Sequence, residues 1–235
     1  MASRIVARLH DLALTVRYRP LALGYALAIS LSNVIMALLP DHDQLSLAQA
    51  ASTNIAHLAT DPLVVLPASA FVDVGTGWLW VPLSLILLGG LETRLGWRRA
   101  LAIVFGAHVI ASLLSESMLL VQIASHAVPH ADVALLDVGP SYVLLAALAG
   151  CLMIGSWRLR VAAVLAGAMV IPSSLEGLTR LDMSAVGHTC AMAFGALLTV
   201  AYSTAARREA LADAALETLE LAPAAATRVL QPARA

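Results

Sequence analysis

The stretch PLALGYALAISLSNVIMALL, residues 20–39, decides the fold class of this chain. It contains no charged side chain, and about 20 apolar residues are what an α-helix needs to cross a bilayer. The following triplet Ala-Gln-Ala, residues 48–50, resembles a signal-peptide cleavage site. The run is nevertheless longer than the apolar core of a signal peptide, and four arginines precede it. We therefore expect a retained transmembrane helix.

The composition extends this expectation to the whole chain. Of its 235 residues 60% are hydrophobic and only 12% are charged, and the mean hydropathy is +0.85. Soluble domains carry about 25% charged residues. Lipid must therefore act as the solvent for much of this chain. The net charge of −1 does not indicate nucleic-acid binding.

Six apolar runs predict an all-α integral membrane protein with six transmembrane helices. They are residues 20–39, 72–91, 100–122, 140–156, 159–174 and 183–204. The fourth and fifth are short and need neighbouring helices around them. A membrane domain over 20–204 would thus follow a cytoplasmic N-terminal segment, 1–19. A cytoplasmic tail, 205–235, would be helical to about Leu221, end its helix at Pro223 and be disordered beyond it.

Arginine placement predicts the orientation. Eleven arginines fall in the N-terminal segment, the 92–99 loop, the 156–160 turn and the start of the tail, whereas only Arg180 lies in a loop on the other side. The positive-inside rule places both termini in the cytoplasm. All basic residues are arginine in an alanine-rich and leucine-rich chain, which is typical of a GC-rich bacterial genome, so we expect a bacterial inner membrane. In the outer segment 40–71, residues 46–58 read as one amphipathic interfacial helix, and Pro62 and Pro67 as breaks after it.

Polar residues within membrane spans are costly and are therefore candidates for function. Three of them have simpler explanations: Glu92 as an interfacial anchor or a loop-capping carboxylate, His108 as a neutral histidine bonded to a neighbouring helix, and Glu116 as a side chain that reaches water. His126 and His130, four apart in an outer loop, lack a third metal ligand. The two cysteines lie in apolar runs and predict no disulfide framework.

Ser141 has a more suggestive setting. In Gly139-Pro140-Ser141-Tyr142, Gly139 can be the N-cap and Pro140 the first helical residue. Ser141 would then lie in the first turn of the fourth span, near free backbone N–H groups and the positive end of the helix dipole, which can stabilise an oxyanion. On this local pattern alone, helix capping is the favoured interpretation of Ser141.

His188 opens the sixth span near the same face of the membrane. Gly187, Ala191 and Gly195 recur every four residues there, the small-xxx-small pattern of closely packed helices. If the fourth and sixth helices pack at these residues, His188 and Ser141 can meet. A serine bonded to a histidine base is the minimal activated nucleophile.

Together these patterns resemble the rhomboid intramembrane serine proteases, and more closely their divergent actinobacterial relatives. The resemblance covers about residues 20–204 and the expected layout of six helices with cytoplasmic termini. It is carried by GPSY at 139–142, His188 with Gly195, GGLETRLG at 89–96, and the outer segments STN at 52–54 and SAF at 69–71.

The resemblance implies cleavage of membrane-anchored proteins just inside the outer face, with substrate helices entering laterally. Ser141 would be the nucleophile, His188 the general base, and the Ser141 N–H, supported by Gly139 and Tyr142, part of the oxyanion hole. No cofactor or metal is implied. Many rhomboids also carry a His and an Asn in the second helix that assist the oxyanion, where this chain has Gly77 and Val81.

Two alternatives stay open at this point. A rhomboid-like pseudoprotease that binds transmembrane segments would explain the missing second-helix donors. A small transporter or structural membrane protein would carry Ser141 and His188 incidentally, and it predicts that the two side chains lie far apart. Tyr142 stands where the family has a glycine, and Leu145 where it often has an aromatic residue beside the histidine; Tyr142 could take over the role of that aromatic.

Overall fold

The computed structural model describes residues 19–75 and 77–229, with side chains as far as residue 214. These residues form helices and connecting loops, with no β-strand among them. The α-helices are α2 (Pro20–Leu38), α3 (Asp41–Ala51), α4 (Ile55–Thr60), α5 (Pro62–Ser69), α6 (Gly77–Leu95), α7 (Trp97–Ala124), α8 (Ser141–Ile154), α9 (Trp157–Ser174) and α10 (Met183–Val229). Two short 3₁₀ helices, η1 (His130–Ala134) and η2 (Leu178–Arg180), lie in loops.

Each predicted span corresponds to one helix, although α6 begins at Gly77 rather than at residue 72. The residues before it form a turn in which Gly75 has a φ of 123°, a backbone conformation that glycine tolerates best. Four helices are long and apolar enough to cross a bilayer: α2, α6, α7 and residues 183–214 of α10. The chain is therefore a multi-pass membrane protein.

The outer surface of these helices is apolar, as lipid contact requires. Large hydrophobic side chains are exposed along α2, α9 and α10, including Leu27, Leu31, Val164, Leu165 and Leu197. A soluble monomer rarely exposes so much contiguous apolar surface. The burial pattern thus supports the same conclusion as the composition.

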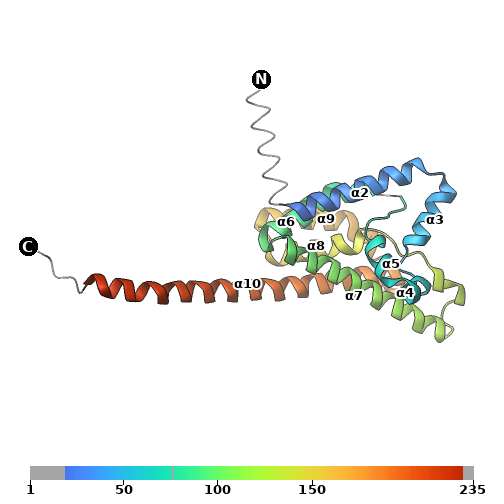
Figure 1. Cartoon of the computed structure of the whole chain (residues 1–235). Helices are drawn as coiled ribbons and strands as arrows, with labels where there is room; N and C mark the ends of the chain where they lie inside the picture. The colour runs from blue at the N-terminus through green and yellow to red at the C-terminus, as the bar shows by residue number, and fades with distance from the viewer. Residues whose placement is uncertain (1–18, 76, 230–235) are drawn as a thin grey trace, which may run out of the picture.

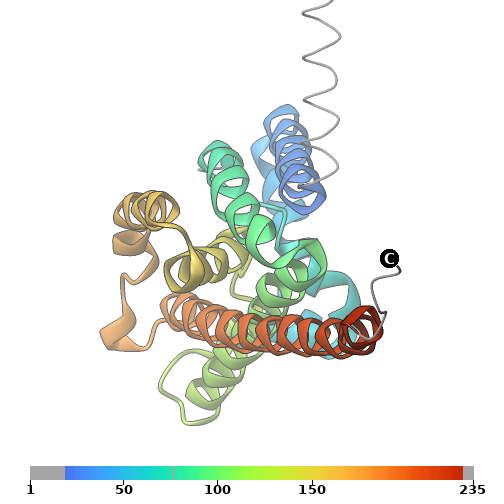
Figure 2. The same ribbon diagram turned by 90° about the vertical axis from the view of Figure 1, so that its left-hand side faces the viewer.

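Helix α8 forms the centre of the bundle. It contacts α6, α7, α9 and α10, and every residue from Tyr142 to Cys151 is buried. A helix that is hydrophobic on all sides belongs in an interior. The surrounding helices, seen in Figure 2, explain how a helix of 14 residues is accommodated.

The two ends of the bundle differ. Figure 1 shows the start of α2 and the distal half of α10 at one end and the short helices α3, α4 and α5 at the other. The loop before α8 belongs to the second end, because the Gly139 N–H donates to the Ser69 carbonyl at 2.8 Å. The candidate residues of α8 and α10 lie at this end.

The outer segment folds differently from the prediction. Instead of one helix over 46–58, α3 ends at Ala51, and α4 starts at Ile55 with Asn54 as its N-cap. The break occurs because Ser52 and Thr53 turn inward and bond to Asp137, which lies 85 and 84 residues further along the chain. Pro62 marks a break, because α4 ends at Thr60 and Pro62 begins α5. Pro67 does not break a helix as predicted, because it lies in the last turn of α5.

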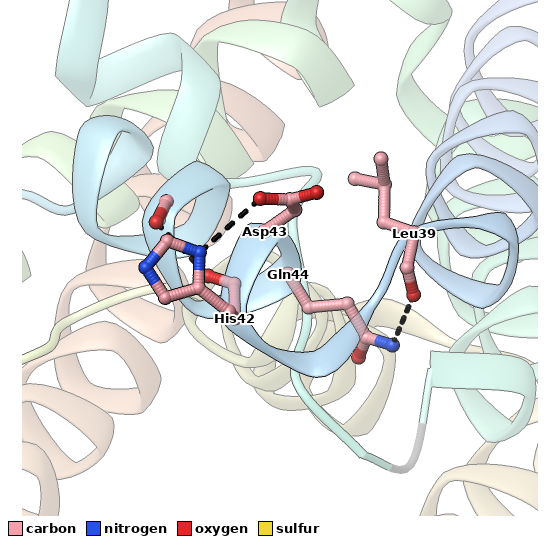
Figure 3. A network of polar contacts seen from close by, with 5 residues as sticks. Leu39, His42, Asp43 and Gln44 are labelled. Carbon is pink, nitrogen blue, oxygen red and sulfur yellow. Dashed lines mark hydrogen bonds and ion pairs between the residues drawn. The ribbon is translucent and has the colours of Figure 1, made fainter.

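The turn between α2 and α3 is closed by local polar contacts, shown in Figure 3. The Gln44 amide donates to the Leu39 carbonyl at 2.9 Å, and His42 Nδ1 lies 3.2 Å from an Asp43 oxygen. Leu39 is the C-cap residue that follows α2. A polar partner for its carbonyl lets the chain reverse without leaving that group unpaired.

Helix α10 runs without interruption across residue 204, the predicted end of the membrane domain. Helix α10 continues from Met183 to Val229 and passes Pro223, which was expected to end it. A proline inside a helix removes one hydrogen bond and tends to kink the axis, but it need not terminate the helix. Residues 1–18 and 230–235 of the two predicted flanking segments lie outside the described residues.

Candidate functional site

A tight turn positions Ser141 at the start of α8. Gly139 has a φ of +134°, which L side chains rarely adopt. Pro140 follows as the N-cap, one position earlier in the helix than predicted, and its carbonyl accepts from the Leu144 N–H at 3.0 Å. Ser141 is then the first helical residue and is half-buried. Backbone N–H groups in this turn lack intrahelical acceptors and lie at the positive end of the helix dipole.

His188 lies in the second turn of α10. Asp182 caps this helix, because its Oδ1 accepts from the N–H groups of Ser184 and Ala185 at 3.1 and 3.4 Å. The cap fixes where the helix begins and so which face carries His188. The imidazole is buried, with 8% of its surface exposed.

The Ser141 and His188 side chains are in contact. His188 Nε2 lies 2.9 Å from Ser141 Oγ, and His188 Nδ1 lies 2.8 Å from the carbonyl oxygen of Ser174. A carbonyl can only accept, so Nδ1 carries the proton and Nε2 presents a lone pair to the serine hydroxyl. A small transporter or structural membrane protein was expected to hold these two side chains far apart, and that prediction is wrong.

Ser174 supplies this carbonyl because α9 ends there. The last carbonyls of a helix have no partner within it, and they form the negative end of its dipole. The imidazole therefore faces an acceptor that would stabilise its positively charged form. The Ser174 carbonyl thereby orients the imidazole ring.

Close packing of α8 against α10 holds the two side chains together. A Cβ on Gly187 would lie 1.9 Å from the Tyr142 hydroxyl oxygen, and one on Gly195 would lie 2.5 Å from Ala146 Cα. Ala191, between them, is buried in a cluster with Tyr142. Only small residues permit this approach.

Tyr142 contacts the imidazole directly. Its ring centroid lies 5.0 Å from that of His188, with an interplanar angle of 84°. This edge-to-face arrangement is a favourable aromatic contact. Tyr142 thus occupies the place beside the histidine. Leu145 is buried in the main core instead.

A cavity of about 340 Å³ opens beside the pair. Leu79 and Trp80 of α6, Met169 and Val170 of α9, and polar groups that include Asp137 line it together with Ser141 and His188. Apolar walls with a few convergent polar groups are typical of a binding site.

The loop that precedes Ser141 is anchored by Asp137. Its Oδ2 accepts from Thr53 Oγ1 at 2.9 Å, and its N–H donates to Ser52 Oγ at 2.9 Å. Burial raises the pKa of the Asp137 carboxyl, and the hydrogen bond from Thr53 offsets part of that rise. The segment 52–54 therefore acts as a brace for the turn that carries the serine.

The other polar candidates serve the fold. Glu92 caps the neighbouring helix α2, accepting from the N–H groups of Leu21 and Ala22 at 3.0 and 2.9 Å. His108 Nε2 lies 2.8 Å from the Leu66 carbonyl of α5, which confirms the expected bond to a neighbouring helix.

Glu116 and the loop histidines are not among the residues that line the cavity beside Ser141 and His188. Glu116 was expected to reach water but is 2% exposed, because η1 and α4 contact α7. Neither of its oxygens has a partner among the described residues at full hydrogen-bond distance and angle. His126 and His130 are exposed. Within residues 19–75 and 77–229, no three His, Cys, Asp or Glu side chains gather as metal ligands would.

Sequence reasoning missed Ser174, Trp80 and Asp137. The Ser174 contribution is a backbone carbonyl, for which no sequence signal exists. Trp80 reads as one more apolar residue of a span. Asp137 lies four residues before Ser141. An acidic side chain beside an apolar run was the one sequence signal that could have identified it as part of the site.

Comparison with known families agrees with this geometry. The sequence profile of the family described as rhomboid-like protein matches residues 16–209, far more than half of the chain. No curated protein and no solved structure matches it.

Proposed function

The chain belongs to the rhomboid-like protein family, and from this premise we propose that it is an intramembrane serine protease that cleaves membrane-anchored proteins near the outer face. Ser141 is the nucleophile and His188 the general base. The observation that carries the proposal is the 2.9 Å contact between Ser141 Oγ and a His188 nitrogen whose partner nitrogen is held by Ser174.

The chemistry follows from this arrangement. Ser141 Oγ attacks the scissile carbonyl carbon while its proton passes to His188 Nε2. The C–N bond then breaks, and the same proton goes to the leaving amine. Water hydrolyses the acyl-enzyme by the reverse proton path and restores Ser141. The Ser141 N–H, in the turn formed by Gly139 and Tyr142, lies at the positive end of α8 and stabilises the oxyanion.

The proposal includes six membrane crossings in a bacterial inner membrane. Helices α8 and α9 are the fourth and fifth crossings, supported by the helices around α8. The arginine distribution puts both termini in the cytoplasm, so the cavity beside Ser141 faces outward. Substrates are transmembrane segments of other proteins that arrive laterally from the lipid.

A rhomboid-like pseudoprotease is the second candidate. It is favoured by one observation: Gly77 and Val81 provide no side-chain donor for an oxyanion. Such a protein would use the same cavity to bind transmembrane segments of client proteins without cleaving them.

A fluorophosphonate probe separates these candidates. The detergent-solubilised protein is treated with the probe beside Ser141→Ala and His188→Ala, with Ser173→Ala as the matched control for a serine in the same cavity. We expect labelling of the wild type and the control and none of the other two. A folded wild-type protein that does not label would refute the protease and favour the pseudoprotease.

A further inference from the structure

The indole N–H of Trp80 is a buried donor without an acceptor. Trp80 is 8% exposed, and its Nε1 makes no hydrogen bond with any described residue. A buried tryptophan N–H usually finds a partner, and an unsatisfied buried donor costs roughly 1–3 kcal/mol. A protein that retains such a group calls for an explanation, and a ligand that supplies the acceptor is one.

The position of this donor points to its acceptor. Trp80 lies in the first turn of α6 and lines the same 340 Å³ cavity as Ser141 and His188. It therefore borders the space in which a scissile carbonyl would meet the nucleophile. Gly77 is packed against the Asn33 side chain, and Val81 packs against the main core. Neither has a side-chain donor, whereas Trp80, which lies between them in α6, carries an indole N–H.

Asp73 is the neighbour that could have taken this hydrogen bond. The Trp80 side chain partly offsets the rise that burial produces in the pKa of the Asp73 carboxyl. A hydrogen bond from the Trp80 side chain is the cause of that offset, but its geometry is poor: neither Trp80 Nε1 nor Asp73 Oδ2 has a partner among the described residues at full hydrogen-bond distance and angle. The indole N–H thus lacks a well-formed hydrogen bond and can donate to a better-placed acceptor that enters the cavity.

We propose that Trp80 Nε1–H is the side-chain donor of the oxyanion hole, acting with the Ser141 backbone N–H. The inference rests on the proposed protease function. It gives the α6 helix a catalytic residue in place of the donors that many rhomboids carry there. The oxyanion forms when Ser141 Oγ bonds to the carbonyl carbon, and the indole then donates to the oxygen without gaining or losing a proton.

The kinetic test uses Trp80→Phe, which removes the N–H and keeps an aromatic ring. We expect kcat for a transmembrane-segment substrate to fall roughly 100- to 1,000-fold, as for loss of one oxyanion donor, with little change in KM. Trp78→Phe is the matched control, because Trp78 neighbours it in α6 but is 58% exposed, and it should retain wild-type kcat. Equal activity of the two variants would overturn the assignment.

A spectroscopic test covers the case in which Trp80→Phe fails to fold. In protein labelled with ¹⁵N at its indoles, reaction of Ser141 with a fluorophosphonate places a phosphonyl oxygen where the oxyanion would be. We expect the Trp80 indole proton to move downfield, those of Trp78, Trp97 and Trp157 to stay, and Ser141→Ala to show no change. An unmoved Trp80 signal in the labelled protein would refute this role but leave the serine and histidine intact. A wild type that neither labels nor cleaves would refute the protease function and this inference with it.

Discussion

The contact between α8 and α10 makes Gly195→Ala an informative perturbation. The new Cβ would stand 2.5 Å from Ala146 Cα and 2.6 Å from its carbonyl oxygen. Carbon atoms pack at about 3.5–4.0 Å, and these partners are backbone atoms that no rotamer change can move. The two helices must therefore separate by about 1 Å at this point.

The separation should affect both stability and the proposed chemistry. Overpacking costs roughly 1–3 kcal/mol, and replacing a helical glycine by alanine returns about 0.5–1 kcal/mol. We expect a net loss near 1–2 kcal/mol. Because Ser141 and His188 sit on these two helices, 2.9 Å apart, an added 1 Å breaks their hydrogen bond and slows fluorophosphonate labelling by roughly 100-fold.

The assay pairs thermal unfolding in detergent with the rate of labelling. Gly106→Ala is the control, because that new Cβ would meet only the tip of Leu198 of the same α10 helix, at an ordinary 3.5 Å. It should label at the wild-type rate. A Gly195→Ala protein that labels as fast as the control and melts no lower would refute the packing argument.

Three further outcomes follow from the described contacts. Glu92→Gln should lower the free energy of unfolding by about 1–3 kcal/mol, because one of two buried acceptors at the start of α2 becomes an amide donor; a melting temperature equal to the wild type would contradict the capping role. Burial raises the pKa of Asp137 in the folded state, so the native protein binds this proton more tightly than the unfolded chain, and the associated stability is lost as pH rises through the native pKa. Asp137→Asn should flatten the melting-temperature profile at pH values above the ordinary aspartate pKa of 3.8, and parallel profiles would count against it. Finally, ¹⁵N NMR of the His188 ring at neutral pH should show the proton on Nδ1, and an Nε2–H tautomer would exclude the orientation set by Ser174.

The sequence by itself determined the helices of the membrane domain. Runs such as 20–39 must become helices in lipid, since a helix satisfies its own backbone hydrogen bonds where water is absent. Small residues every fourth position, from Gly187 to Gly195, identified the face of α10 that packs most closely. The pair Ser141 and His188 was recognisable from motif and order, because the first turn of a helix gives a serine a predictable setting.

Tertiary structure alone decided how these pieces meet. Residues 46–58 could not be read as two helices, because the break at Ser52 depends on Asp137 from a distant loop. The partner of His188 is a main-chain carbonyl, and every residue carries one, so only the end of α9 selects that of Ser174. Whether an indole N–H is satisfied or free depends on what surrounds Trp80 in space. Sequence patterns specify what a segment can bury, whereas the partner of each polar group is set by segments far away along the chain.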